Sequence, residues 1–205
     1  MRVLSMLLAA TVAAMALPGT SRAADPRYPD WPCVQAKVPQ MSVAAMWDGP
    51  SIADVGNAWQ DDPEIKDLVA KVAARRTPLD AAAKSIADFI TGAPAEKQDK
   101  AKKLFAGVFD SLAVQRSEVM DGIERVSRSQ KELADKIRAD VAALRDLQDQ
   151  PQPDEAKIAA LGSQVEWGTR IFEDRRKTIR YVCEVPTTIE QRVFALARVI
   201  RQALD

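Results

Sequence analysis

The sequence contains no histidine. Histidine is the most frequent general base near neutral pH and the commonest zinc ligand, so Ser-His-Asp and Cys-His catalytic arrangements are excluded. Glycine is scarce, and neither a glycine-rich phosphate loop nor an Asp-x-Asp-x-Asp-Gly calcium loop occurs. We therefore predict no catalytic residue, no metal site and no cofactor, and we expect that the protein is not an enzyme.

Neither sign of charge is in excess, since the chain holds 29 basic and 29 acidic residues. Without Arg2 and Arg22, which belong to the leader described next, 27 basic and 29 acidic residues remain. A protein surface that binds nucleic acid carries a concentrated excess of Lys and Arg. The balance therefore argues against a nucleic-acid partner.

Long apolar runs are also missing, and the longest, residues 3–17, is short for a membrane span. It follows the positive Arg2 and precedes the small residues Ser21 and Ala23, which suit a signal peptidase. We predict a signal peptide over residues 1–23 and a periplasmic location for the mature protein. An uncleaved membrane anchor is the alternative.

Cysteine is limited to Cys33 and Cys183, near opposite ends of the mature chain. An even count in an exported protein predicts a disulfide, which here would close almost the whole chain. Two free thiols, one of them reactive, are the alternative.

Proline and tryptophan are concentrated in residues 24–50, where each X-Pro pair resists helix formation. We expect this stretch to be an extended arm that lies over a helical body. Trp31 and Trp47, with nearby Trp59, are its expected anchors because each buries a large apolar area.

From residue 51 onward, helical periodicity and capping signals predict helices and no strand. A short helix is expected from Ser51 to Trp59, and further helices are expected to start at Asp62-Pro63 and at Pro94 with Glu96. The helix that starts at Thr77-Pro78 is expected to end at Gly92 and to bury Leu79, Ile86, Phe89 and Ile90. A capping box at Thr188–Gln191 predicts the start of the last helix.

Two heptad patterns flank the proline-containing segment 149–153. The first runs through Val119, Ile123, Val126, Leu133, Ile137, Leu144 and Leu147, and the second through Ile158, Leu161, Val165, Gly168, Phe172, Arg175, Ile179 and Val182. Folding at the turn predicts a coiled-coil hairpin that pairs Ile137 with Gly168 and Leu133 with Phe172, with a polar layer of Gln130 and Arg175.

These patterns predict an all-α fold: a long antiparallel helical hairpin, about residues 95–184, packed with shorter N- and C-terminal helices. Residues 51–205 form one helical domain, to which the disulfide ties the extended arm.

Two charged clusters are candidate interaction sites. The hairpin tip carries Asp146, Asp149, Asp154 and Glu155. They are either a docking surface for a basic partner or a solubilising turn. The second cluster includes Arg175, Arg176 and Arg180. We expect interhelical ion pairs there, and a site for an anion or lipid headgroup is the alternative.

Several short strings resemble those of an uncharacterised group of small exported all-helical proteobacterial proteins. They are Asp30-Trp31-Pro32-Cys33, Arg75-Arg76-Thr77-Pro78, Gly122-Ile123-Glu124-Arg125 and Val182-Cys183-Glu184-Val185-Pro186. The resemblance implies export and a helical fold, and it implies no activity.

The leading hypothesis is a periplasmic accessory or scaffolding protein that acts through protein–protein contacts, because a rigid hairpin presents a long surface. The expected partner is another envelope protein or a second copy, and contact of the last helix with a membrane surface is less favoured. Phe105, Val108, Phe109 and Leu112 would meet either the first helices or the partner. The alternative is a small-ligand or metal-binding carrier with its pocket between the hairpin and the arm.

Overall fold

The computed structural model describes residues 25–205, so the predicted signal peptide lies outside the described residues. Every regular element in that part of the chain is a helix, which confirms the all-α class. The elements are α1 (Val43–Met46), η1 (Ala58–Gln60), α2 (Pro63–Ala73), α3 (Leu79–Thr91), η2 (Pro94–Glu96), α4 (Lys97–Gln148), α5 (Glu155–Val182) and α6 (Val185–Gln202).

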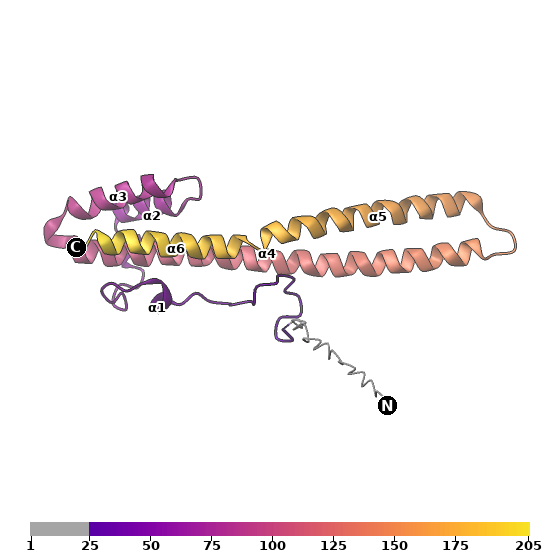
Figure 1. The fold of residues 1–205 in the computed structure, drawn as a ribbon, viewed down its shortest axis with the longest axis horizontal. Coiled ribbons are helices and arrows are strands. Elements are labelled where there is room, and N and C mark those ends of the chain that lie inside the picture. Colours follow the sequence, from indigo (N-terminus) through magenta and orange to yellow (C-terminus); the bar gives the residue numbers. More distant parts are fainter. Residues whose placement is uncertain (1–24) are drawn as a thin grey trace, which may run out of the picture.

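Helix α4 is the spine of an elongated molecule (Figure 1). Its 52 residues extend about 78 Å at 1.5 Å per residue. α5 and α6 pack against α4 one after the other, α5 along its second half and α6 along its first (Figure 1). The predicted hairpin of α4 and α5 is therefore present, and α6 continues in the direction of α5 along α4.

The pairing of α4 with α5 follows the predicted register. A Cβ built on Gly168 would lie 3.3 Å from Cγ1 of Ile137, so these two positions face each other. Nearby, the Gln164 amide donates a hydrogen bond of 2.8 Å to the Asp140 carboxylate. The glycine allows the two helices to approach closely where the larger isoleucine side chain needs room.

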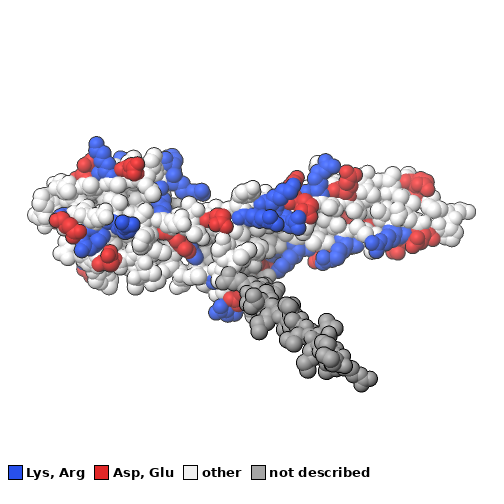
Figure 2. All heavy atoms as spheres, viewed as in Figure 1, with Lys and Arg blue, Asp and Glu red and all other residues white. Residues whose placement is uncertain are grey.

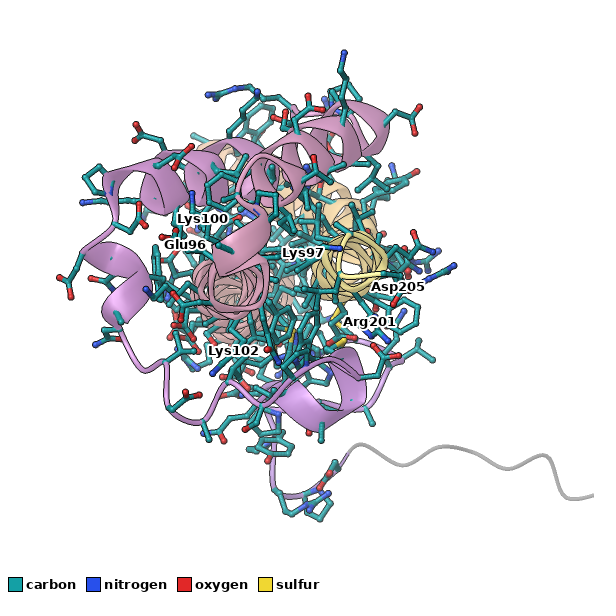
Figure 3. All side chains as sticks on the ribbon, turned by 90° about the vertical axis from the view of Figure 1, so that its left-hand side faces the viewer. Glu96, Lys97, Lys100, Lys102, Arg201 and Asp205 are labelled. Atoms are coloured by element: carbon teal, nitrogen blue, oxygen red, sulfur yellow. A yellow bond between two sulfur atoms is a disulfide. The ribbon has the colours of Figure 1, made fainter. Side chains whose placement is uncertain are left out.

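The core lies at the other end of the molecule, which we call the body: α2, α3, α6 and the first half of α4. In the view along the rod, α2 and α3 cover one side of the α4–α6 pair and α1 covers the other (Figure 3). Phe105, Leu112, Ile86 and Leu196 are among its fully buried side chains. The body is therefore three layers thick.

Local capping chemistry explains several helix ends. The Asp62 carboxylate accepts hydrogen bonds from the backbone N–H groups of Glu64 and Ile65, as the sequence predicts for a helix N-cap. Gly92 is the C-cap of α3, also as predicted. α4 starts directly after the predicted Pro94–Glu96 segment.

The predicted helix from Ser51 to Trp59 is wrong. Residues 53–57 form turns, and only the 3-10 helix η1 follows. Gly56 has φ +49°, a left-handed conformation that interrupts a right-handed helix.

Two further expectations about helix ends need correction. α6 begins at Val185 rather than at a Thr188 cap, and the Thr188 hydroxyl donates to the Glu184 carbonyl. Pro186 is tolerated because the N–H groups of a first helical turn have no intrahelical partner. At the start of α3, Leu79 is 46% exposed rather than buried.

The apolar residues in the first half of α4 pack against other segments of the same chain. Phe105, Val108 and Leu112 are fully buried in the body. The Trp47 ring stacks on Phe105 with 4.3 Å between ring centroids. These residues meet the arm and the short helices, so they offer no surface to a partner.

The arm, residues 25–50, is extended apart from α1 and runs along one side of the rod (Figure 1). The predicted disulfide joins Cys33 to Cys183, across 150 residues of sequence and with 5.6 Å between Cα atoms. The Lys37 ammonium pairs with Glu124 of α4 at 2.5 Å. The arm is thus fastened covalently and electrostatically to the middle of the rod.

Arg116 of α4 connects three elements. It is only 4% exposed, its Nε lies 2.6 Å from Glu190 of α6, and its Nη2 lies 2.7 Å from the Val38 carbonyl of the arm. Similarly, the Arg192 guanidinium donates to the Val72 carbonyl in the last turn of α2 and to the Thr77 carbonyl in the loop that follows. The bond to Val72 satisfies a carbonyl that a helix C-terminus leaves unpaired.

Candidate interaction surface

The second half of the rod consists of only two helices. No residue from 131 through 182 is buried, although the paired heptad positions are half-buried. We call residues 131–171 the distal hairpin. It projects beyond the body, and apart from the contacts of the arm at its base, around Lys131, both of its flanks are uncovered (Figure 1).

Trp167 is the large aromatic residue that the distal hairpin leaves exposed, at 62%. Its neighbour Arg170 lies over the ring, 5.8 Å from the centroid. Tryptophan and arginine are over-represented among residues that dominate binding energy at protein interfaces. The heptad and charge patterns do not indicate this residue, although its place outside the apolar heptad positions is a usable signal.

An open groove lies between α4 and α5 where the hairpin joins the body. Its apolar walls are Val119, Ile123 and Val126 from α4 and Ile179 and Val182 from α5. The cavity volume is about 480 Å³. Val126 remains 44% exposed, so the groove is accessible from solvent.

Two guanidinium groups border the open groove. Arg175 lines it from α5. A terminal nitrogen of Arg125 lies 3.7 Å from the position that a Cβ on Gly122, another lining residue, would occupy. Neither arginine forms an ion pair with any residue of 25–205, whereas the lining Asp174 is paired with Lys177 at 3.4 Å.

The opposite flank of the same helices is covered by the arm. There the Asp30 carboxylate contacts Lys131 at 2.8 Å and Arg128 at 3.4 Å. Pro32 lies against the helices beside them and lines a cavity of about 330 Å³. The hydrogen bond from Lys131 lowers the pKa of Asp30 below its ordinary value of 3.8.

Gln130 occupies the interface between α4 and α5 at this level and is 7% exposed. Its amide nitrogen donates to the Phe172 carbonyl at 3.1 Å, while its buried oxygen has no partner. The predicted polar layer with Arg175 is replaced by this side-chain-to-backbone bond, because Arg175 is exposed at the rim of the open groove.

The three predicted tryptophan anchors differ in environment. Trp47 is 8% exposed and Trp59 is 9% exposed. The Trp59 indole N–H donates to the Asp110 carboxylate at 3.0 Å. Trp31 is half-buried and bonds to the Gln35 carbonyl within the arm. Trp47 and Trp59 therefore belong to the core of the body.

The acidic residues at the hairpin tip are spread along both helix ends. Asp146, Asp149 and Glu155 are exposed, whereas Asp154 is the N-cap of α5. The Asp154 carboxylate accepts a hydrogen bond from the Lys157 N–H, which lowers its pKa. No group of acidic and cysteine side chains within residues 25–205 is arranged to hold a metal ion.

The prediction of interhelical ion pairs by the basic residues of α5 is wrong. Arg176 pairs with Glu173, and Arg170 with Glu166, both within α5. Across residues 25–205, no ion pair joins α5 to α4. Arg176 and Arg180 are exposed and line the cavity beside Pro32 of the arm. Figure 2 shows Lys and Arg side chains gathered along the middle part of the rod.

The end of the body carries a polar cavity of about 650 Å³. Lys97 of α4 and Arg201 and Asp205 near the C-terminus line it (Figure 3). Arg201 and Asp205 neutralise each other through a contact of 2.7 Å.

No helix within residues 25–205 combines the length and apolar character needed to cross a membrane. Comparisons of the chain with protein-family models, curated proteins and solved structures give no match.

Proposed function

We propose that this protein is an exported periplasmic scaffolding protein that acts through protein–protein contacts, with the distal hairpin as its contact surface. The observation that carries the proposal is the exposed Trp167, with Arg170 over its ring, on a two-helix projection without buried residues. An aromatic side chain in that position gains apolar burial only when another molecule covers it.

The disulfide supports the proposed location. A bond between Cys33 and Cys183 is stable in an oxidising compartment such as the periplasm. Protein recovered from the periplasmic fraction is expected to begin at Ala24, which N-terminal sequencing measures. A chain that retains residues 1–23 would contradict export by signal cleavage.

Site-specific photo-crosslinking in the native host tests the contact surface. A photoreactive amino acid at Ser163, one helical turn from Trp167, is expected to give a discrete adduct, whereas the same probe at Arg198 on the body gives none. Trp167→Ala should abolish the Ser163 adduct. Tyr181→Ala, which removes an aromatic ring that is 79% exposed near the body, is the matched control and should retain it.

Both variants are expected to melt at the wild-type temperature, because each ring is mostly exposed. An adduct between two copies of the chain would identify the partner as a second copy. Adducts that are insensitive to Trp167→Ala, or a hairpin that gives no adduct, would refute this contact surface.

A further inference from the structure

We propose that the open groove between α4 and α5 binds a free single-chain alkyl carboxylate, with the chain between the helices and the carboxylate held by Arg125 or by Arg175, the two arginines that border the groove at different levels. This inference goes beyond the proposed scaffolding function and concerns a different part of the hairpin.

The walls of the groove favour an apolar chain. Val119, Ile123 and Val126 on one side and Ile179 and Val182 on the other make most of the lining apolar, and its polar members are Asp174, Arg175 and Thr178. A volume of about 480 Å³ falls within the lower half of the range for small-molecule sites. That size suits one alkyl chain better than a two-chain lipid.

The rim of the groove favours an anionic head group. Arg125 and Arg175 both lack an ion-pair partner among the described residues. Arg175 lines the groove, and Arg125 lies beside the lining residue Gly122. A guanidinium binds a carboxylate through two parallel hydrogen bonds. Asp174, the acidic residue of the lining, is already paired with Lys177 and does not neutralise them.

The covered flank provides an internal precedent for this ligand chemistry. There the arm places an apolar residue, Pro32, against α4 and α5 and a carboxylate, Asp30, on the cations Arg128 and Lys131. The open groove repeats the same combination of apolar helix flank and basic rim. An apolar chain that ends in a carboxylate supplies both contacts there.

Calorimetric titration of the disulfide-bonded protein with dodecanoate, below its micelle concentration, tests the proposal. We expect saturable binding of one molecule per chain, at least tenfold tighter than binding of dodecyltrimethylammonium or dodecyl maltoside. From octanoate to dodecanoate, each added methylene should tighten binding about three- to fourfold while it is still buried.

Variants separate the head-group contact from the groove. The double variant Arg125→Gln with Arg175→Gln should weaken dodecanoate binding at least tenfold, and Arg138→Gln with Arg145→Gln on the distal hairpin is the matched control. Gly122→Leu should abolish binding by filling the groove. It should leave the chain folded, because a Cβ at Gly122 meets only the exposed Arg125 side chain, at a distance of 3.7 Å.

Equal affinity for the cationic or neutral amphiphile, an unchanged affinity in the double variant, or binding only to phosphatidylglycerol vesicles would overturn the proposal. Trp167→Ala should leave the titration unchanged, so failure of the scaffold surface and failure of the ligand site are distinguished.

Discussion

Arg116 is the buried charged side chain of the described residues, and its environment is asymmetric. The guanidinium is enclosed between α4, α6 and the arm, whereas the side chain of its partner Glu190 is 32% exposed. A buried charge that loses its partner costs more than a half-exposed carboxylate that loses its own, because water can hydrate the latter.

We therefore expect Glu190→Leu to destabilise the protein more than Arg116→Met. Loss of the carboxylate strands the buried guanidinium and should cost about 3 kcal/mol. Arg116→Met removes the charge and leaves Glu190 to water, at a cost of about 1–2 kcal/mol. Urea denaturation of both variants measures the difference, and the reverse order would show that Glu190 is not the main partner of Arg116.

Gln130 carries a buried side-chain oxygen that has no hydrogen-bond partner among the described residues. Gln130→Leu keeps the packing volume, removes the orphaned acceptor and loses one hydrogen bond to a helix carbonyl. We expect a gain in the free energy of unfolding of about 1 kcal/mol. A loss of stability in the same denaturation assay would mean that the bond to Phe172 outweighs the orphaned oxygen.

At the scale of elements, the arm is an extended segment that contributes little core of its own between Asp25 and Met41. Its attachment depends on the Cys33–Cys183 bond, on Lys37 and on the Asp30 contacts. Cross-linking across 150 residues reduces the entropy of the unfolded chain by an amount worth at most about 5 kcal/mol.

Reduction of the disulfide should therefore lower the melting temperature and loosen the arm, while the body keeps its helices. Mass spectrometry of digested protein should first show the peptides of Cys33 and Cys183 joined. The double variant Cys33→Ser with Cys183→Ser should reproduce the lower melting temperature without reductant. An unchanged melting temperature would show that the other contacts of the arm suffice.

The arm should also respond to acid through Asp30. The pKa of this carboxyl is lowered by Lys131, so its stabilising contribution is complete above the unfolded value near 3.8 and is lost as the pH falls through the lower folded value. NMR titration should find a pKa below 3.8 for Asp30, and Lys131→Gln should raise it. Asp30 titrating at its ordinary value would remove this contact from the attachment of the arm.

At the scale of the whole molecule, the body holds the buried core and the distal hairpin contributes no buried residue to it. The buried side chains all lie at residues 47–130 and 183–200, and none lies in the projection. We therefore expect that the hairpin can be shortened by deletion without loss of the core.

Deletion of two heptads from each helix of the hairpin, residues 134–147 of α4 and 158–171 of α5, tests whether the body folds without the projection. Leu133 would still face Phe172 across the same turn, so the register is kept. We expect the body to remain folded, with the Arg116 and Trp47 contacts intact, and the Trp167-dependent crosslink to be lost. Circular dichroism that shows global unfolding would mean that the body depends on the projection.

Much of this architecture is predictable from local patterns. The Asp62 cap, the Gly92 end of α3, the heptads and the turn between them were sufficient for the helices and the hairpin register, because helix ends and apolar periodicity depend on residues close in sequence. The Cys33–Cys183 pairing followed from having two cysteines in a chain predicted to be exported.

Other features were decided only by the tertiary structure. Capping signals do not indicate that Pro186 opens α6, that Arg116 and Arg192 satisfy carbonyls far along the chain, or that the arm covers one flank of α4 and α5 and leaves the other open. Periodicity specifies which face of a helix is apolar, whereas packing between distant segments determines how much of that face is covered, and the open groove and Trp167 are the parts that stayed uncovered.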